Sequence, residues 1–114
     1  MRLYIAILDE FPDYMCPTLV AHAMLSAHLK FAGIDAYDEW LNTSFRKCVI
    51  SVNQREFDKI AALPHTHLGH EIHTLGGKPS AAIPLPCDDL QLPKVLKFAK
   101  LWKPNNEQCS EAQL

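Results

Sequence analysis

The sequence holds 114 residues, of which 48% are hydrophobic and 21% are charged, and its formal net charge is −2 at pH 7. This length suits one domain with its own core and is too short for two. The composition is that of an ordinary globular protein. The net charge gives no overall attraction for nucleic acid. No apolar run approaches the roughly 18 residues of a membrane span.

The first expected element is a strand at residues 3–8. These residues form a continuous apolar run, which suits a central strand that is covered on both faces. Asp9, Glu10 and Pro12 end the run, so residues 9–16 are expected to form a loop.

A helix is expected at residues 18–32. The segment contains no Gly or Pro and is rich in Ala and Leu, Pro17 suits a first helical turn, and Gly33 suits a helix end. Small side chains would allow this helix to lie close to a sheet, and they are Ala21, Ala23, Ser26 and Ala27.

A second, short helix is expected to begin at Asp35. Asp35 and Asp38 form the pattern of a helix start, and the Asn-Thr-Ser segment at residues 42–44 ends the helix. Its apolar anchors would be Tyr37, Trp40 and Leu41.

A second strand and a third helix follow along the chain. Residues 48–52 are mostly apolar and β-branched, which favours a strand. Asn53 followed by Glu56 is the pattern of an N-cap with its reciprocal acid, which predicts a helix to about Leu63, closed by Pro64.

The last third of the chain is expected to hold two strands and a helix. Alternating side chains favour a strand at residues 66–72, and Gly-Gly-Lys-Pro at residues 76–79 is a turn. A short strand follows at residues 80–85, where Pro84 indicates an edge or an end of the sheet. Residues 92–102 favour a last helix that closes in a brief extended piece.

The predicted order is therefore β-α-α-β-α-β-β-α. Strands separated by helices predict an α/β protein with a four-stranded mixed sheet and helices on both faces, in a three-layer α/β/α arrangement. We expect one domain over residues 1–102, followed by a polar C-terminal tail over residues 103–114.

This order resembles that of the type II peptidyl-tRNA hydrolases over residues 2 to about 102. The resemblance is carried by the opening apolar strand, by the pair His22-Ala23 in an Ala-rich helix, and by a short Trp-bearing helix before the second strand. It implies the same fold, and a hydrolase of the ester between a peptide and the ribose of a tRNA. The chain would be a divergent member, or one of the small proteins of that fold that depart from the pattern at the same positions.

The chain departs from the family's catalytic pattern. The family has a lysine seven residues before the histidine and a glutamine three residues before it, where this chain has Met15 and Leu19 before His22. The family's aspartate after the third strand and threonine at the start of the fourth correspond to Glu71 and Ser80. The carboxylate and the hydroxyl are thus retained, and the cation is lost.

The lost cation argues against the family's activity. A lysine at this place would neutralise the developing oxyanion and hold the phosphate backbone of the substrate. No Lys or Arg lies between Arg2 and Lys30, so Lys78 or Arg46 would have to reach in from a loop to replace it. The acidic loop before the first helix, which contains Asp9, Glu10 and Asp13, would also repel a phosphate.

Three polar residues are the candidate catalytic groups. His22 would act as a general base or position the substrate, Glu71 would act as a base, and Ser80 would orient water or substrate. The alternatives are a histidine hydrogen-bonded to a neighbouring loop and a glutamate on the solvent face of an edge strand. The candidate binding residues are Met15, Lys78 and His73.

Four histidines lie between residues 65 and 73, but their spacing does not predict a metal site. On a strand, His65 and His67 face one side and His70 the other, and none follows the H-E-x-x-H spacing of helical zinc ligands. A loop could still gather three of these histidines, so the sequence leaves open whether they meet, and the expectation from their spacing is no metal and no cofactor.

The cysteines and the N-terminal segment favour a cytoplasmic protein. The four cysteines, at positions 16, 48, 87 and 109, form no C-x-x-C pair. The opening apolar run is too short for a signal peptide. We expect free thiols in the cytoplasm.

Two functions remain open. The favoured one is a non-catalytic module that binds a protein partner or a small ligand as a homodimer, with an exposed apolar patch around Phe11, Tyr14 and Met15. The alternative is a weak or altered hydrolase of peptidyl-tRNA or a related ester. It predicts that the three candidate catalytic side chains converge on one cleft at the N-terminal end of the first helix. The charge disfavours tRNA as a partner, and no membrane partner is expected.

Overall fold

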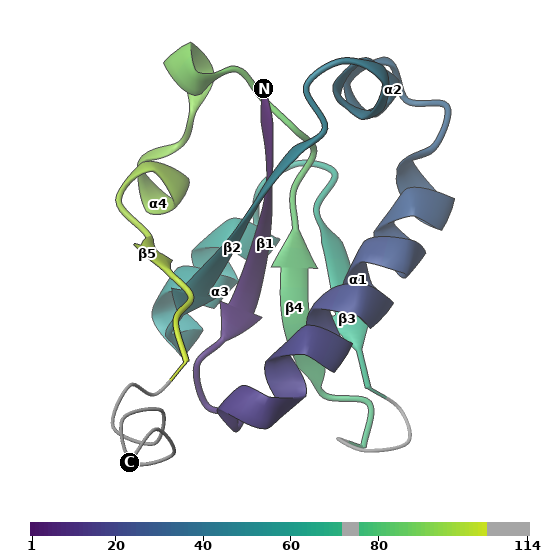
Figure 1. Ribbon diagram of the computed structural model, residues 1–114. Coiled ribbons are helices and arrows are strands. Elements are labelled where there is room, and N and C mark those ends of the chain that lie inside the picture. The colour runs from purple at the N-terminus through teal and green to yellow at the C-terminus, as the bar shows by residue number, and fades with distance from the viewer. Residues whose placement is uncertain (72–75, 105–114) are drawn as a thin grey trace, which may run out of the picture.

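A five-stranded mixed sheet forms the middle of the molecule in the computed structural model, which describes residues 1–71 and 76–104 (Figure 1). The strands are β1 (Arg2–Leu8), β2 (Arg46–Val52), β3 (His67–His70), β4 (Pro79–Ile83) and β5 (Lys100–Leu101), in the spatial order β3-β4-β1-β2-β5. β1 and β2 pair in parallel, and the other neighbours pair antiparallel. The chain is therefore a mixed α/β protein.

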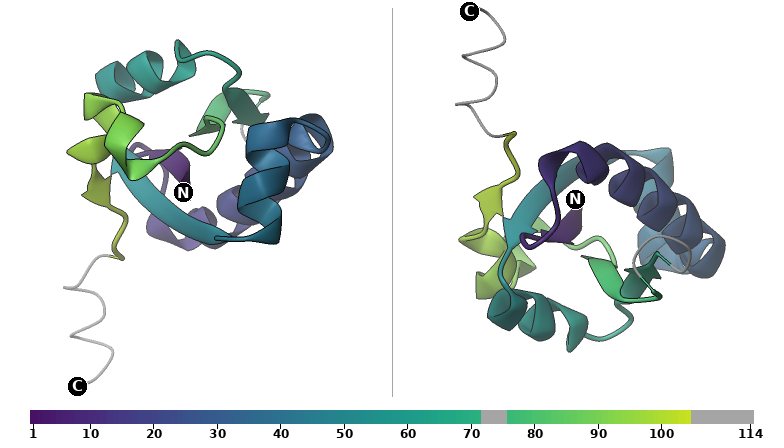
Figure 2. Two further views of the ribbon diagram at one scale, coloured as in Figure 1. Left: turned by 90° about the horizontal axis from the view of Figure 1, so that it is seen from above. Right: turned by 90° about the horizontal axis from the view of Figure 1, so that it is seen from below.

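Helices pack on both sides of the central strand. Those of the described residues are α1 (Cys16–Phe31), α2 (Asp35–Asn42), α3 (Gln54–Ala61) and α4 (Lys94–Lys97), with short 3-10 turns at Asp13–Met15 and Asp89–Gln91. Viewed from above and from below, α1 and α2 lie on one side of β1, and α3 and α4 on the other (Figure 2). None of these described helices has the length and apolar character needed to cross a bilayer.

Alternate side chains of β1 enter two separate core clusters. The odd-numbered residues from Leu3 to Ile7 pack with side chains of α1 and α2. The even-numbered residues from Tyr4 to Leu8 pack with side chains of α3 and α4. This burial of both faces explains why the strand is apolar at every position rather than at every second one.

α1 approaches β3 very closely at Gly69. A Cβ atom on Gly69 would lie 3.1 Å from the Cβ atom of Ala23, which is closer than an ordinary packing contact. Ala23 and Ala27 are both buried in the face of α1 that meets the sheet, as its small side chains predicted. This close approach fixes α1 against the β3–β4 hairpin and positions the site described below.

Local signals predicted the element order and several helix ends. The order of the first eight elements is confirmed. Gly33 follows α1 with φ at 95°, as expected for a glycine just past a helix. The Asn53 side chain accepts a hydrogen bond from the Glu56 N–H at 2.8 Å, and the Glu56 carboxylate accepts from the Asn53 N–H at 3.0 Å, so the predicted capping pair is present.

α2 begins at Asp35, as predicted, but the cap of this helix differs from the expected pattern. Ile34, rather than Asp35, is the N-cap residue, and no side chain caps the helix. The Asp38 carboxylate instead accepts a hydrogen bond from the backbone N–H of Gly33 at 3.0 Å. The acidic pattern therefore stabilises the turn between α1 and α2.

The helix predicted at residues 92–102 is too long, and the predicted number of four strands in the sheet is wrong. α4 ends at Lys97, and β5 pairs antiparallel with Ile50 and Ser51 of β2. This pairing covers backbone groups on the outer edge of β2 that would otherwise be exposed. Over residues 1–71 and 76–104, the sheet therefore has five strands.

The described cysteines carry free thiols, and they are Cys16, Cys48 and Cys87. Cys109 lies outside the described residues, as does the predicted polar tail from residue 105 onward. The end of the strand predicted at residues 66–72 also falls outside them, at Ile72.

Candidate functional site

A pocket of about 250 Å³ lies between α1 and the β3–β4 hairpin. Side chains or backbone of eight residues line it: Leu19, His22, Ala23, Ser26, Gly69, His70, Glu71 and Ser80. We call it the polar pocket. It brings together the three candidate catalytic residues, and it lies along the middle of α1 rather than at the N-terminal end, where the sequence hypothesis placed it.

His22 and Glu71 form a hydrogen-bonded pair in this pocket. His22 lies on α1, Glu71 directly follows β3, and the His22 Nδ1 atom lies 2.8 Å from the Glu71 Oε1 atom. The His22 side chain is 62% exposed, whereas the Glu71 side chain is only 11% exposed. The carboxylate is therefore held inside the protein, and the imidazole remains open to solvent.

The pairing sets the tautomer of the neutral His22 imidazole. An ionised carboxylate only accepts hydrogen bonds, so the Nδ1 atom carries the proton and donates it to Glu71. The Nε2 atom then holds the free lone pair and is available to water or to a bound substrate. A carboxylate that orients a histidine in this way is a general-base arrangement.

Ser80 lies in the buried wall of the polar pocket. It sits on β4 with 2% exposure, and its hydroxyl donates a long 3.4 Å hydrogen bond to the carbonyl of Gly69. A bond of this length is weak, so the hydroxyl can turn toward a bound group. Among the described residues, Glu71 and Ser80 are the only buried polar or charged ones, and both line this pocket.

Ser26 and His70 extend the polar wall, and the sequence analysis did not assign them to the site. The Ser26 hydroxyl donates to the Ala23 carbonyl at 3.0 Å and lies 2.7 Å from the Nε2 atom of His67. Because the hydroxyl has one proton to donate, His67 is the donor in the second contact. Ser26 comes four residues after His22, so helical spacing would have placed both on one face.

The predicted binding residues do not gather in the polar pocket. Met15 is half-buried against the core just before α1. Lys78 forms an ion pair with Glu10 of the acidic loop, and its Nζ atom lies 5.7 Å from the centroid of the Phe11 ring. The acidic loop thus attracts the charge of Lys78 away from the pocket. His73 lies outside the described residues.

No described residue replaces the cation that the family resemblance requires. Neither a Lys nor an Arg is among the described residues that line the polar pocket. Arg46 begins β2, two strands away from β4, and its carbonyl accepts a hydrogen bond from the Trp40 indole N–H at 2.8 Å. The described lining of the pocket therefore gives a phosphate no Lys or Arg side chain to bind.

The described histidines near β3 make separate contacts rather than one cluster. His70 donates through Nδ1 to the Gly77 carbonyl at 2.9 Å, and His65 is exposed with φ at 60°. Burial, and then the positive charges of Lys30 and His70, lower the pKa of His67 and favour its neutral form. In the described parts of the chain, no three His, Cys, Asp or Glu side chains are placed to bind a metal ion.

The exposed apolar patch expected around Phe11, Tyr14 and Met15 does not form. Tyr14 is 82% exposed, but Phe11 and Met15 pack against the core. Exposed apolar side chains occur elsewhere among the described residues, and they include Leu25 of α1, which is 65% exposed, and Phe45 before β2, which is 55% exposed.

Comparison with family models and with the sequences of curated proteins gives no relative from which a function could be inferred. No protein-family model matches the chain, and no curated protein matches its sequence. The resemblance to the type II peptidyl-tRNA hydrolases stays a prediction, and function is inferred from the geometry of the polar pocket.

Proposed function

We propose that the protein is a hydrolase of small, uncharged esters, on a three-layer α/β/α scaffold like that of the type II peptidyl-tRNA hydrolases. One observation carries the proposal: the 2.8 Å contact between His22 Nδ1 and the nearly buried carboxylate of Glu71, in a pocket of about 250 Å³. A pocket of this size suits a small molecule.

The proposed reaction uses water as the nucleophile. The Nε2 atom of His22 takes a proton from water as the water oxygen attacks the ester carbonyl, and Glu71 stabilises the imidazolium that forms. The hydroxyl of Ser80 turns from the Gly69 carbonyl to donate to the oxyanion. When the ester C–O bond breaks, His22 returns the proton to the leaving oxygen, and an acid and an alcohol are released.

The missing cation restricts the substrate class. A peptidyl-tRNA substrate brings phosphates to the site, and these gain from contacts with Lys or Arg. The described lining of the polar pocket offers neither, and Glu71 would repel a phosphate. A free, uncharged ester fits this pocket better than an ester carried on tRNA.

The test measures release of p-nitrophenolate from p-nitrophenyl acetate by the wild-type protein and by Glu71→Gln and His22→Gln variants. We expect each substitution to lower kcat/KM by about a hundredfold, because each removes the oriented base. His65→Asn is the control for non-specific attack by surface imidazoles, since His65 is exposed and asparagine tolerates its φ of 60°. Equal rates for all four proteins would contradict the proposal.

A non-catalytic module that binds a small ligand or a protein partner is the second candidate. This candidate is favoured by Met15, which stands where the type II peptidyl-tRNA hydrolases have a lysine. This candidate predicts no turnover of p-nitrophenyl acetate, and none of a diacetyl-lysyl-tRNA, above the rate of the Glu71→Gln variant. Its dimeric form predicts twice the monomer mass in gel filtration.

A further inference from the structure

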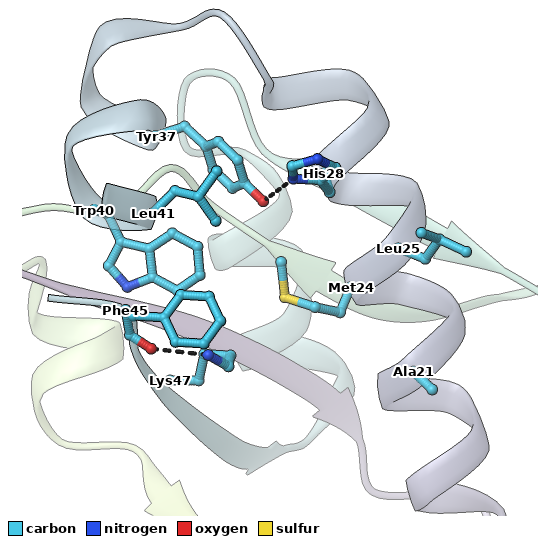
Figure 3. A pocket seen from close by; sticks show the side chains of 9 residues that line it. All are labelled: Ala21, Met24, Leu25, His28, Tyr37, Trp40, Leu41, Phe45 and Lys47. Carbon is cyan, nitrogen blue, oxygen red and sulfur yellow. Dashed lines mark hydrogen bonds between the residues drawn. The ribbon is translucent and has the colours of Figure 1, made fainter. Parts of the chain in front are cut away.

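A second pocket, of about 370 Å³, lies on the other flank of α1 (Figure 3). The side chains that matter for its chemistry are Met24, Leu25, Tyr37, Trp40, Phe45 and Lys47, from α1, α2 and the entry to β2. We call it the apolar pocket, because only Lys47 and His28 among its lining residues carry an ionisable nitrogen.

The aromatic wall of the apolar pocket is fixed by hydrogen bonds and stacking. The buried Trp40 ring donates through Nε1 to the Arg46 carbonyl at 2.8 Å. The hydroxyl of the buried Tyr37 lies 2.9 Å from His28 Nδ1, which ties α2 to α1. The Phe45 ring stacks on Trp40 with a centroid distance of 5.5 Å and an interplanar angle of 26°. Contacts within the protein thus hold the wall in place.

Phe45 adopts a backbone conformation that bulky residues rarely take. Its φ is 56°, in the left-handed region. This conformation accompanies the stacking of the Phe45 ring on Trp40 and the contact of its carbonyl with the Lys47 Nζ atom at 2.8 Å. Strained residues of this kind collect at ligand sites, where the surrounding structure holds them.

Lys47 brings a positive charge to the rim of the pocket. Its Nζ atom lies 3.2 Å from the centroid of the Phe45 ring and 5.3 Å from that of Trp40. Burial lowers the pKa of Lys47, so an anionic neighbour would favour its charged form. Among the residues that the structure describes, no Asp or Glu forms an ion pair with Lys47.

We infer that the apolar pocket binds a small monocarboxylic acid with an apolar body, such as a medium-chain or aryl-alkyl carboxylate. The body would lie between α1 and α2, and the carboxylate would accept a hydrogen bond from Lys47 Nζ. A single cation suits a monoanion better than a phosphate, which is usually bound by several donors. A cationic ligand is excluded because Lys47 already covers the aromatic faces. This inference does not depend on the proposed hydrolase activity.

The test compares three probes that share one apolar body: octanoate, 1-octanol and octylammonium. Calorimetric titration of the full chain is expected to show saturable octanoate binding, about tenfold weaker binding of octanol, and no binding of octylammonium. Equal affinities for the three probes, or no saturable binding of octanoate, would overturn the inference.

Substitutions at Lys47 separate its charge from its packing. Lys47→Met keeps an apolar stem and is expected to weaken octanoate binding about tenfold, which removes the preference over octanol. Lys47→Arg keeps the charge and is expected to retain binding. Lys59→Met makes the same charge change at an exposed position of α3 and is expected to have no effect. Unchanged octanoate affinity in Lys47→Met would contradict the inference.

Leu25→Glu tests whether a ligand or a second copy of the chain occupies the pocket. Leu25 is 65% exposed, so the substitution is compatible with folding. A carboxylate at this rim is expected to weaken octanoate binding at least about tenfold by repulsion. If the wild-type protein elutes as a dimer that Leu25→Glu dissociates, a second copy covers the pocket and the carboxylate proposal fails.

Discussion

The two flanks of α1 carry pockets of opposite chemistry. His22 and Ser26 line the polar pocket beside β3 and β4, whereas Met24, Leu25 and His28 line the apolar pocket beside α2. With 3.6 residues per helical turn, positions four apart share a face, so neighbouring positions can serve different sites. One helix therefore separates two surfaces that single substitutions can test independently.

The elements that face α1 explain why the pockets differ. On one flank, Gly69 lets β3 pack tightly against Ala23, and this brings the carboxylate of Glu71 next to His22. On the other flank, the large rings of Tyr37 and Trp40 form the wall. The first pocket measures about 250 Å³ and the second about 370 Å³. Close backbone approach thus gives a small pocket around a hydrogen-bonded pair, and aromatic packing gives a larger apolar one.

The largest expected effect is a double dissociation between the two pockets. His22→Gln should lower kcat/KM for p-nitrophenyl acetate by about a hundredfold and leave octanoate affinity unchanged, because only the oriented base is lost. Lys47→Met should weaken octanoate binding about tenfold and leave kcat/KM for p-nitrophenyl acetate unchanged. Ester hydrolysis and calorimetric titration on both variants measure the effect, and a joint loss in either variant would mean that the two pockets are not independent.

The contact between α1 and β3 gives the next largest effect. Gly69→Val should lower the free energy of unfolding by about 2 kcal/mol, because its side chain meets Ala23 at 3.1 Å and neither backbone can move freely. Urea denaturation measures the loss. The same variant should also lose esterase activity, since Glu71 lies two residues further along the chain, and it should still bind octanoate.

A swap of the two small residues is the matched control for this contact. Gly69→Ala with Ala23→Gly moves one methyl group from the helix to the strand. The pair should be more stable than the sum of the two single changes predicts, because the methyl groups no longer collide. Strict additivity in this cycle would show that the contact is not the source of the strain.

Signals that act over a few residues predicted much of the fold. The apolar run of β1, the glycine after α1 and the Asn53–Glu56 capping pair each depend on neighbours in sequence, and each is present. β5 was predicted only in part, as the brief extended piece expected at the end of the last helix. The segment that contains Lys100 and Leu101 has a helical pattern, but pairing with the edge of β2 decides its conformation.

The candidate site was predictable only in part. The family resemblance proposed His22, Glu71 and Ser80, and the structure brings them around one pocket, although their catalytic roles stay predictions. Lys78 could not be placed from sequence, because its partner Glu10 lies far away along the chain. The apolar pocket was also missed, since it depends on the left-handed backbone of Phe45 and on the angle between α1 and α2.

A smaller effect is expected at Phe45 on the apolar side. Phe45→Asn should change the free energy of unfolding by less than about 1 kcal/mol, because relief of the left-handed strain offsets the lost ring contacts. Octanoate affinity should fall, since the ring that covers the pocket is gone. Urea denaturation and titration separate the two results. A large loss of stability would show that Phe45 supports the fold rather than the pocket.

The smallest effect is a change in pH dependence on the polar side. Burial, followed by Lys30 and His70, lowers the pKa of folded His67 below its ordinary value, so the unfolded chain binds a proton at this position more readily. Stability therefore falls as the pH drops through about 6.5, the unfolded value, and the loss levels off below the folded pKa.

His67→Gln removes this loss and should give a shallower fall of Tm between neutral and mildly acidic pH. His65→Asn, at an exposed histidine, should leave the slope unchanged. Parallel slopes for wild type and His67→Gln would mean that burial and the positive charges of Lys30 and His70 do not disfavour protonation of His67 in the folded protein.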